Sequence, residues 1–346
     1  MAAGFGWADM ERRKNIRWAA FAAASLMYLA GLWSWKETER YDSLVPLVLS
    51  RPISAEDGQK IWDAGRENKA SVAFCFWGET GEQMVSCKET GGAARVNRIV
   101  LSGNPELLEA GGLAWRDGCL VDTASAQALF GTAFCENQTL TADTKVFPVV
   151  GIRENARPTM VSRAEGNQAV LNRCVLATPS SQGRVLGEQF LMRWELEGAV
   201  LDFYPLRALC RNLLLLFPEA LLVSLGLSLG EARKKLTLEG LRCRKQLPLL
   251  GKSLLGMAIL LGSLWLLGKQ VTVPGDMIPS RWSDFSLWGR WWESQKENFQ
   301  RIFSTPLESR WLQMQGNMVK SMVCSTGAAI LALLAVRREN RADPAD

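Results

Sequence analysis

The chain has 346 residues, of which 48% are hydrophobic, and its 40 Lys and Arg against 35 Asp and Glu give a formal net charge of +5. It contains no histidine, which excludes Ser-His-Asp and Cys-His hydrolases, HExxH metalloproteases and His-ligated zinc sites. The average composition resembles that of a globular protein, but the apolar residues gather in long uncharged runs near the two ends. We therefore predict membrane segments around a folded aqueous domain.

Four apolar runs approach the roughly 20 residues that a helix needs to cross a bilayer. With their flanks, they predict transmembrane helices at residues 18–35, 206–230 (including a short stalk), 249–268 and 317–336. The first run also resembles a signal peptide, since basic residues precede it. It has no small-x-small cleavage site near its end, and Trp33 and Trp35 at that boundary favour an uncleaved anchor with an interfacial aromatic belt.

The distribution of basic residues predicts the orientation of these helices. With a cytoplasmic N-terminus, the inner pieces are residues 1–17, 231–248 and 337–346, which hold thirteen Lys and Arg in forty-five residues. The outer pieces, 36–211 and 269–320, hold twenty-six in 228 residues. The positive-inside rule favours this arrangement. We predict a multi-pass protein of the cell membrane with both termini cytoplasmic, an extracytoplasmic domain at 36–205, a cytoplasmic coupling loop at 231–248 and an extracytoplasmic loop at 269–316.

The predicted outer domain has the alternating short strands and helices of one mixed α+β domain. Ser54 is a candidate N-cap for a helix over Ala55–Arg66, with Asp57 three residues on. β-like runs at 71–77 and 83–88 flank Gly78-Glu-Thr-Gly-Glu82, which predicts a hairpin turn there. Further strands are predicted at 98–102, 146–152, 168–176 and 199–204, and further helices at 105–110 and 185–196.

A helix over Ala124–Phe130 is predicted after the apolar pair Leu120-Val121, with Thr123 as its N-cap and Gly131 as its C-cap. Ala126, Leu129 and Phe130 would then be core residues, which specify a fold and perform no chemistry.

This region resembles the extracytoplasmic core domain of MacB-type ABC transporter permeases. The resemblance rests on Cys119-Leu-Val-Asp-Thr-Ala-Ser-Ala-Gln-Ala-Leu-Phe-Gly131, on Asn137-Gln-Thr-Leu140 and on Phe147-Pro-Val-Val-Gly-Ile152. Asn137 stands where the family's turn usually has glycine. The predicted plan of one helix, a large outer domain and three further helices resembles that family too, and the last three helices resemble the FtsX-like permease unit. The loop at 269–316 is longer and richer in tryptophan than the resemblance implies.

The resemblance implies the membrane subunit of an ABC transporter, paired with itself or with a homologous permease. A separate ATPase subunit would drive movement of the outer domain and export of a peptide, an antibiotic or a lipoprotein. The alternatives are an FtsX-like regulator of an extracellular cell-wall hydrolase, and a membrane-anchored receptor without an ATPase. In each case we expect no catalytic, cofactor-binding or metal-binding residues, contact with membrane lipid, and no nucleic acid.

The chain itself lacks a phosphate-binding loop. The string from Gln246 to Ser253 ends in Gly-Lys-Ser but has Gln246 in place of the first glycine, and it runs into a membrane segment. A partner would dock on the cytoplasmic loop, where leucines alternate with cations in a short amphipathic pattern. The candidate docking residues are Arg233, Lys234, Lys235, Leu238, Leu241, Arg242, Arg244 and Lys245. The alternative is that these cations only maintain topology and contact anionic lipid.

Two features of the second apolar run are candidates for function. Glu219 is the one acid inside it, and intramembrane acids often mark ion or substrate paths. The alternative is structural, because Pro218 precedes it and favours a kink, with a stalk helix ending near Phe217. Gly226 and Gly230 form a GxxxG pattern, which permits close helix packing in lipid.

The Trp-rich outer loop predicts an amphipathic helix from Ser283 to about Phe303. Its apolar residues at helical spacing are Phe285, Trp288, Trp292, Phe299 and Ile302 or Phe303. We expect this helix to rest on the outer leaflet or to pack under the large domain; a role in contacting substrate is the alternative.

Five cysteines fall in the predicted outer domain: Cys75, Cys87, Cys119, Cys135 and Cys174. Cys75 and Cys87 flank the predicted hairpin, and Cys119 and Cys135 bracket one helix, so either pair is a candidate disulfide. The outer location permits disulfides but does not demand them, and the pairing stays open.

Overall fold

The computed structural model describes residues 4–223 and 286–341, except for gaps at 68–71, 115–116, 134, 136–137, 154–156, 168, 306 and 308, and a few residues between 257 and 271. The chain divides into two compact units. The unit that we call the α/β domain comprises residues 41–204 and 289–309, and the helical unit comprises residues 1–40, 205–288 and 310–346. The cytoplasmic loop, the GxxxG glycines and most of the predicted third span lie outside the described residues.

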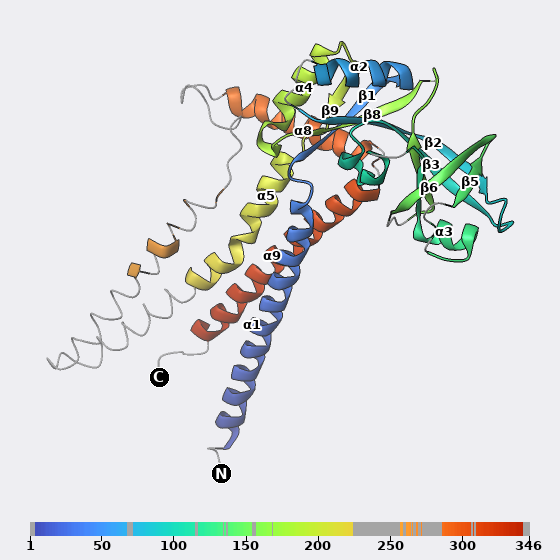
Figure 1. Cartoon of the computed structure of the whole chain (residues 1–346). Helices are drawn as coiled ribbons and strands as arrows, with labels where there is room; N and C mark the ends of the chain where they lie inside the picture. Colours follow the sequence, from blue (N-terminus) through green and yellow to red (C-terminus); the bar gives the residue numbers. More distant parts are fainter. Residues whose placement is uncertain are drawn as a thin grey trace. The chain divides into compact units, whose positions relative to one another are not determined.

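The α/β domain is built on a sheet with the strand order β3-β7-β4-β6-β5-β2-β8-β1-β9 (Figure 1). The strands are β1 (Leu44–Ser54), β2 (Phe74–Ser86), β3 (Ala93–Gly103), β4 (Cys119–Asp122), β5 (Thr139–Ala142), β6 (Lys145–Arg153), β7 (Thr159–Arg163), β8 (Ala169–Ala177) and β9 (Gly198–Val200). Because β2 also pairs with β3, the circuit β2-β3-β7-β4-β6-β5 is closed. The remaining strands β8, β1 and β9 extend the sheet from the first residues of β2.

Each part of the sheet has its own hydrophobic core. Helices α2 (Ala55–Glu67) and α4 (Gly183–Arg193) cover the extension, where the Phe74 ring lies 5.4 Å from that of Trp62 and 5.0 Å from that of Phe190. Helix α3 (Thr123–Phe130) covers the closed circuit and contributes Ala126, Leu129 and Phe130 to a second buried cluster. The predicted mixed α/β fold of this unit is therefore confirmed.

The predicted cap of the first domain helix is confirmed. The backbone N–H of Asp57 donates to Ser54 Oγ at 3.0 Å, and the Ser54 hydroxyl donates to the Asp57 carboxylate at 2.7 Å. This hydrogen bond, with the nearby Lys60 ammonium, outweighs the small effect of desolvation and lowers the pKa of Asp57. The local motif at 54–57 thus starts α2 where the sequence indicates.

The N-cap of α3 is one residue earlier than predicted. Asp122, not Thr123, has the extended backbone of a cap, and its Oδ1 accepts from the N–H groups of Ala124 and Ser125 at 3.0 and 3.1 Å. Its Oδ2 accepts from the N–H of Thr159 at 2.7 Å, at the start of β7. The two carboxylate oxygens let one side chain bind two elements, α3 and β7. Gly131 ends the helix with φ 72°, as predicted.

The hairpin predicted at residues 78–82 is wrong, because β2 runs straight through this segment. Its pairing with β3 shifts by one residue between Glu79 and Gly81, which is a β-bulge. A Cβ at Gly78 would lie 1.8 Å from the carbonyl oxygen of Val170, so this glycine permits close approach of two strands and forms no turn. The chain reverses later, where the N–H of Cys87 donates to the Gly92 carbonyl at 2.9 Å.

The candidate pairing of Cys75 with Cys87, which the sequence left open, is contradicted. Cys75 lies near the start of β2 and Cys87 follows its end, so roughly 40 Å of extended strand separates them. None of the cysteines that the structure describes forms a disulfide bond. Cys119 and Cys135 share the buried cluster under α3 without a disulfide between them.

Smaller differences concern short helices. The predicted helix at 105–110 is a pair of 3₁₀ turns, η1 (Pro105–Leu108) and η2 (Gly111–Ala114), separated by Glu109 with φ 55°. The helix predicted at 185–196 is α4, which begins and ends two to three residues earlier.

The helical unit contains α1 (Gly4–Glu39), α5 (Tyr204–Leu214) and α9 (Ser309–Arg341). Small residues bring α1 and α9 together: a Cβ at Gly31 would lie 3.1 Å from Ser325 Oγ, and one at Gly327 would lie 2.6 Å from the Met27 methyl. Cys210 of α5 contacts α9 through the Met318 carbonyl, at 3.7 Å from its Sγ. Close packing of these helices follows from the small residues at their contacts.

The helix that follows α5 confirms the predicted break. α5 ends at Leu214, and a second helical segment continues over residues 216–223. Proline at 218 has no N–H to donate to the Leu214 carbonyl, and its ring crowds that oxygen. The break therefore falls three residues before the end that the sequence analysis predicted near Phe217.

Within the part of the chain that the structure describes, one helix meets the length and composition of a membrane span. It covers Arg310–Ala335, with a mean hydropathy of 1.7 in its most apolar window. It contains the predicted fourth span at 317–336 except for the last residue. The predicted first span at 18–35 lies inside the helix α1, and crossing of a membrane at the other positions stays a prediction.

Candidate functional site

Helix α8 (Ser286–Ser304) is the amphipathic helix predicted between Ser283 and Phe303. Most of it belongs to the α/β domain. Its inner face is the row Gln295, Asn298 and Ile302, which are at most 8% exposed. The spacing of three and four residues places these side chains on one side of the helix. Of the two expected positions of this helix, on the outer leaflet or against the large domain, packing against the domain fits the buried inner face.

Asn298 binds α8 to the segment between β9 and α5. Its Nδ2 donates to the Asp202 carbonyl at 2.7 Å, and its Oδ1 accepts from the Asp202 N–H at 3.3 Å. The side-chain amide thus satisfies both backbone groups of one residue, as a neighbouring strand would. Asp202 also accepts from the Tyr204 N–H at 2.9 Å through Oδ1, at the first turn of α5. The strand predicted over 199–204 stops at Val200 for this reason.

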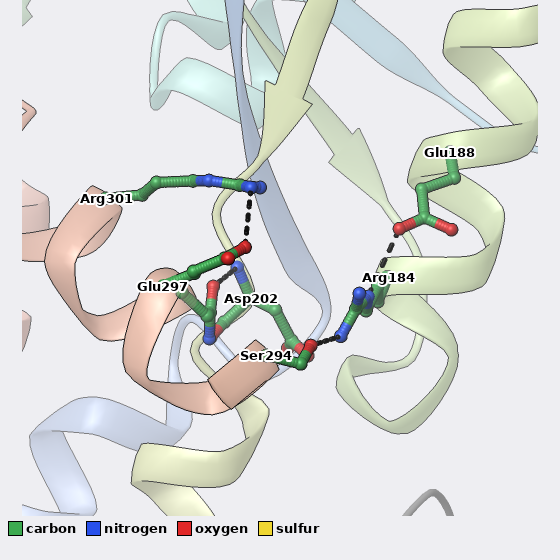
Figure 2. Close-up of polar contacts among 7 residues, drawn as sticks. Arg184, Glu188, Asp202, Ser294, Glu297 and Arg301 are labelled. Atoms are coloured by element: carbon green, nitrogen blue, oxygen red, sulfur yellow. Dashed lines mark hydrogen bonds and ion pairs between the residues drawn. The ribbon is translucent and has the colours of Figure 1, made fainter. Parts of the chain in front are cut away.

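A second contact joins α8 to α4 (Figure 2). Arg184 donates from Nη1 to Ser294 Oγ at 3.0 Å and from Nε to Glu188 at 3.1 Å. On α8 itself, Arg301 pairs with Glu297 at 3.5 Å. The charged pairs are half-exposed and contribute between 0 and about 1 kcal/mol each, so the buried Asn298 supplies most of the specificity of the contact. These residues line a small polar cavity of about 40 Å³, which is room for two or three waters.

Hydrogen bonds also hold the first residues of the domain, where the chain enters it. The Ser180 N–H donates to the Asp42 carbonyl at 3.1 Å, and its hydroxyl donates to Asp42 Oδ1 at 2.9 Å. Ser180 lies in the 3₁₀ turn η3 (Ser180–Gln182), which leads directly into α4. α4 and the turn before it therefore contact both the entering chain and α8.

We call the set Asp42, Ser180, Arg184, Asp202, Ser294 and Asn298 the junction cluster. Two of its members, Asp42 and Asp202, lie within three residues of the points in the sequence where the α/β domain follows α1 and leads into α5. The sequence analysis identified α8 but missed every residue of this cluster. The one local signal was the pair Ser294 and Asn298, a polar row at helical spacing between aromatic residues.

The site residues named from the sequence have different outcomes. The eight candidate docking residues between Arg233 and Lys245, and both GxxxG glycines, lie outside the described residues. Glu219 is half-buried in the segment after the helix break, and the Ser263 hydroxyl donates to its Oε2. Whether Glu219 marks an ion or substrate path or only a kink stays a prediction. Its Oε1 is buried and has no hydrogen-bond partner among the described residues.

Among the residues described, no group of three or more Cys, Asp or Glu side chains is arranged to hold a metal ion. The junction cluster offers two hydroxyls, two carboxylates, one amide and one guanidinium group, whose hydrogen bonds join separate segments of the chain.

No protein-family model and no curated protein matches the chain. Among solved structures, the chain is similar to the periplasmic region of MacB from Actinobacillus actinomycetemcomitans, with 10% identity over 44% of this chain and 81% of that one, and a TM-score of 0.33. It is similar to the extracellular domain of the noncanonic ABC-type transporter YknZ from Gram-positive bacteria, with 10% identity over 45% and 98% and a TM-score of 0.34. A domain of a putative permease protein from Porphyromonas gingivalis gives 14% identity over 47% and 91%, with a TM-score of 0.33.

Proposed function

We propose that the chain is the permease subunit of a MacB/FtsX-like ABC transporter. In this proposal it crosses the cell membrane four times with both termini in the cytoplasm. It pairs with itself or a homologous permease, and a separate ATPase subunit binds at the inner face. ATP hydrolysis there moves the outer α/β domain and drives export of a substrate of the peptide, antibiotic or lipoprotein class.

The observation that carries the proposal is the way in which the α/β domain is inserted. Residues 41–204 follow the 36-residue helix α1 and lead directly into α5. A hydrogen bond holds the chain near each boundary, between Ser180 and Asp42 and between Tyr204 and Asp202. The motif that resembles MacB-type domains forms β4, α3 and β6 inside this insertion. A domain inserted between two helices of the sequence suits a mechanical task better than a free receptor domain at the end of a tether.

The junction cluster gives the mechanical step a physical route. A shift of the chain at Tyr204 would reach α8 through Asp202 and Asn298, because two partly buried hydrogen bonds join these residues. Packed, hydrogen-bonded elements transmit small displacements as rigid pieces. Movement of the helices would therefore tilt the domain as a whole.

The partner is expected on the cytoplasmic loop. Leu238 and Leu241 would enter a cleft of the ATPase subunit, and the cations Arg233, Lys234, Lys235, Arg242, Arg244 and Lys245 would contact an acidic rim. Exchange of both leucines for aspartate removes the apolar contact and adds like charge against that rim.

The test is co-purification of the full-length protein from its native membrane, with ATPase activity and the identity of bound ABC-type ATPase as readouts. Leu238→Asp combined with Leu241→Asp is expected to lower the recovered ATPase at least about tenfold, as loss of 1.4 kcal/mol or more requires. Met192→Asp is the matched control, since Met192 is 70% exposed on α4 of the domain and should leave recovery unchanged.

The outcomes separate the candidate functions. An ATPase that remains bound to the double variant contradicts the docking assignment. Absence of any ATPase with the native protein contradicts the transporter and favours the receptor alternative. A bound ATPase together with a cell-division defect on deletion, and no export defect, favours the FtsX-like regulator.

A further inference from the structure

Helix α8 carries an aromatic stripe that the domain covers only in part. Trp292, Phe299 and Phe303 are spaced by seven and four residues, so they share one side of the helix. Trp292 is 65% exposed and Phe303 is 62% exposed, while Phe299 is partly buried. With Gln295, Lys296 and Gln300, they line a shallow groove. The inner face with Asn298 and Ile302 is buried, so α8 has one face bound and one aromatic face that is largely exposed.

The length of chain between the stripe and the next helix limits how far the stripe can lie from the membrane. Phe303 and Arg310, the first residue of the helix that is apolar enough to cross a membrane, are seven positions apart in the sequence. This length of chain reaches about 25 Å when fully extended, and the helical residues 310–316 before the predicted span add about 10 Å. If residues 317–336 span the bilayer, as the proposed function requires, the end of the stripe stays within about 35 Å of the membrane surface.

The composition of the stripe matches the interfacial layer of a bilayer. Trp and Phe on one face of an amphipathic helix bury about 5–10 Å deep at the boundary of headgroups and acyl chains. Lys296, at the edge of the stripe, has a long apolar stem that can extend its ammonium back to the headgroups. The charged residues Glu293, Glu297 and Arg301 are exposed elsewhere on the helix, where they would remain in water.

A second copy of the chain fits the stripe less well. Trp288, one turn before Trp292, extends this side of the helix and is 40% exposed. Four aromatic side chains bury about 150–250 Å² each at most, and Phe299 is already partly buried. A stable dimer buries about 800 Å² on each partner, so the aromatic face alone is marginal for a protein interface but sufficient for a helix that is already tethered.

We infer that the stripe Trp292, Phe299 and Phe303 inserts into the outer leaflet of the membrane, so that α8 binds lipid on one face and the α/β domain on the other. This inference rests on the proposed membrane topology. In this arrangement α8 binds the membrane surface and the α/β domain at the same time, so the domain stays in contact with lipid when it moves.

The test uses the full-length protein in lipid nanodiscs, in a background with Cys243 and Cys324 replaced by serine. The six other cysteines are buried and should not react. The variants Phe303→Cys and Glu293→Cys are each labelled with the fluorophore NBD. Quenching is measured with lipids that carry a nitroxide at acyl carbon 5 and, separately, with aqueous iodide. Lipid quenching is expected to be at least about threefold stronger at position 303 than at 293, and iodide quenching correspondingly weaker, because only the stripe reaches the acyl boundary.

Two results would overturn the inference. Equal iodide quenching at both positions would place the stripe in water. Protection of position 303 from both quenchers would show that protein covers it, either a second copy or another partner. Impermeant-maleimide labelling of Lys60→Cys on α2 in intact cells tests the topology separately, since the Lys60 side chain is 74% exposed. Failure there contradicts the proposed function, whatever the nanodisc result.

Discussion

Asn298 of α8 and Asp202 are joined by two hydrogen bonds that use both polar atoms of the amide and both backbone groups of Asp202. Asn298 is 8% exposed, so neither bond competes freely with water. Asp202 in turn receives the N–H of Tyr204 where α5 begins. One side chain therefore holds the helix α8 against the place where the domain sequence continues into α5.

Asn298→Asp should release α8 from the domain while leaving the fold of the domain intact. The carboxylate has no donor for the Asp202 carbonyl and brings negative charge against that oxygen. Loss of a buried hydrogen bond with an unsatisfied partner costs about 1–3 kcal/mol. We expect faster hydrogen exchange in α8, by about tenfold or more, with the amides of β2 and β3 unchanged.

Gln300→Glu is the matched control, because Gln300 is an exposed amide on the same helix. The same amide-to-acid change there should leave the exchange of α8 as in the native protein. Equal effects of the two substitutions would mean that the charge of α8, and not the contact with Asp202, holds the helix.

Asp122→Ala should destabilise the α/β domain strongly. The carboxylate is 2% exposed, caps α3 through two N–H groups and also receives the N–H of Thr159. The lost cap costs about 1 kcal/mol, and an orphaned buried N–H adds about 1–3 kcal/mol. We expect a loss of roughly 2–4 kcal/mol in the free energy of unfolding of the domain, measured by urea-dependent proteolysis of the full chain.

Thr123→Ala distinguishes the observed cap from the one that the sequence analysis predicted. Thr123 is exposed, and α3 takes its side-chain cap from Asp122. Removal of its hydroxyl should cost less than about 0.5 kcal/mol. A larger loss for Thr123→Ala than for Asp122→Ala would reverse the assignment of the cap.

The structural features that the sequence predicted are those set by neighbouring residues. The Ser54–Asp57 cap, the Gly131 C-cap, the break before Pro218 and the helix α8 each depend on a few residues in a row, so their patterns carry the signal. Gly78 shows the limit. A glycine followed three residues later by another indicates a turn, but the need for glycine at 78 comes from Val170, ninety-two residues away in sequence.

The junction cluster was unpredictable from sequence for the same reason. Asp42 meets Ser180, Arg184 meets Ser294 and Asp202 meets Asn298 only after the chain has folded. Each of these side chains is an ordinary polar residue in its local sequence. Helical spacing could place Ser294 and Asn298 on one face, but it could not identify the backbone groups that they would bind.

Gly78→Ala tests whether β2 is continuous. A methyl group at this position would overlap the Val170 carbonyl of β8, so the strands must separate or the bulge must move. Such overpacking costs about 1–3 kcal/mol, and we expect a melting temperature several degrees lower for the domain. In a hairpin turn the substitution would be milder. Gly111→Ala is the control, because its nearest neighbour would lie 3.8 Å from the new Cβ and the loss should be small.

The buried thiol of Cys119 should make the domain sensitive to alkaline pH. Burial is the main cause that raises the pKa of Cys119 from 9.0 to about 12; the nearby Cys135 thiol adds to this rise, and Arg98 opposes it. Below pH 9 the thiol is protonated in both the folded and the unfolded chain, and the stability is complete. Between pH 9 and about 12 the unfolded chain releases this proton and the folded chain keeps it. The free energy of unfolding should then fall by about 1.4 kcal/mol per pH unit from this group alone.

Cys119→Ala removes this titration, although it also leaves a small cavity. The informative quantity is therefore the change in stability between pH 8.5 and pH 10.5 within each protein, measured by urea-dependent proteolysis, since the constant cost of the cavity cancels. The native protein should lose about 2 kcal/mol more than the variant over this interval. Lysine, tyrosine and the other buried thiols titrate alike in both proteins, so they do not enter the difference. Parallel pH curves would mean that the Cys119 thiolate is tolerated in the folded domain, which requires that water or a cation reaches the core beneath α3.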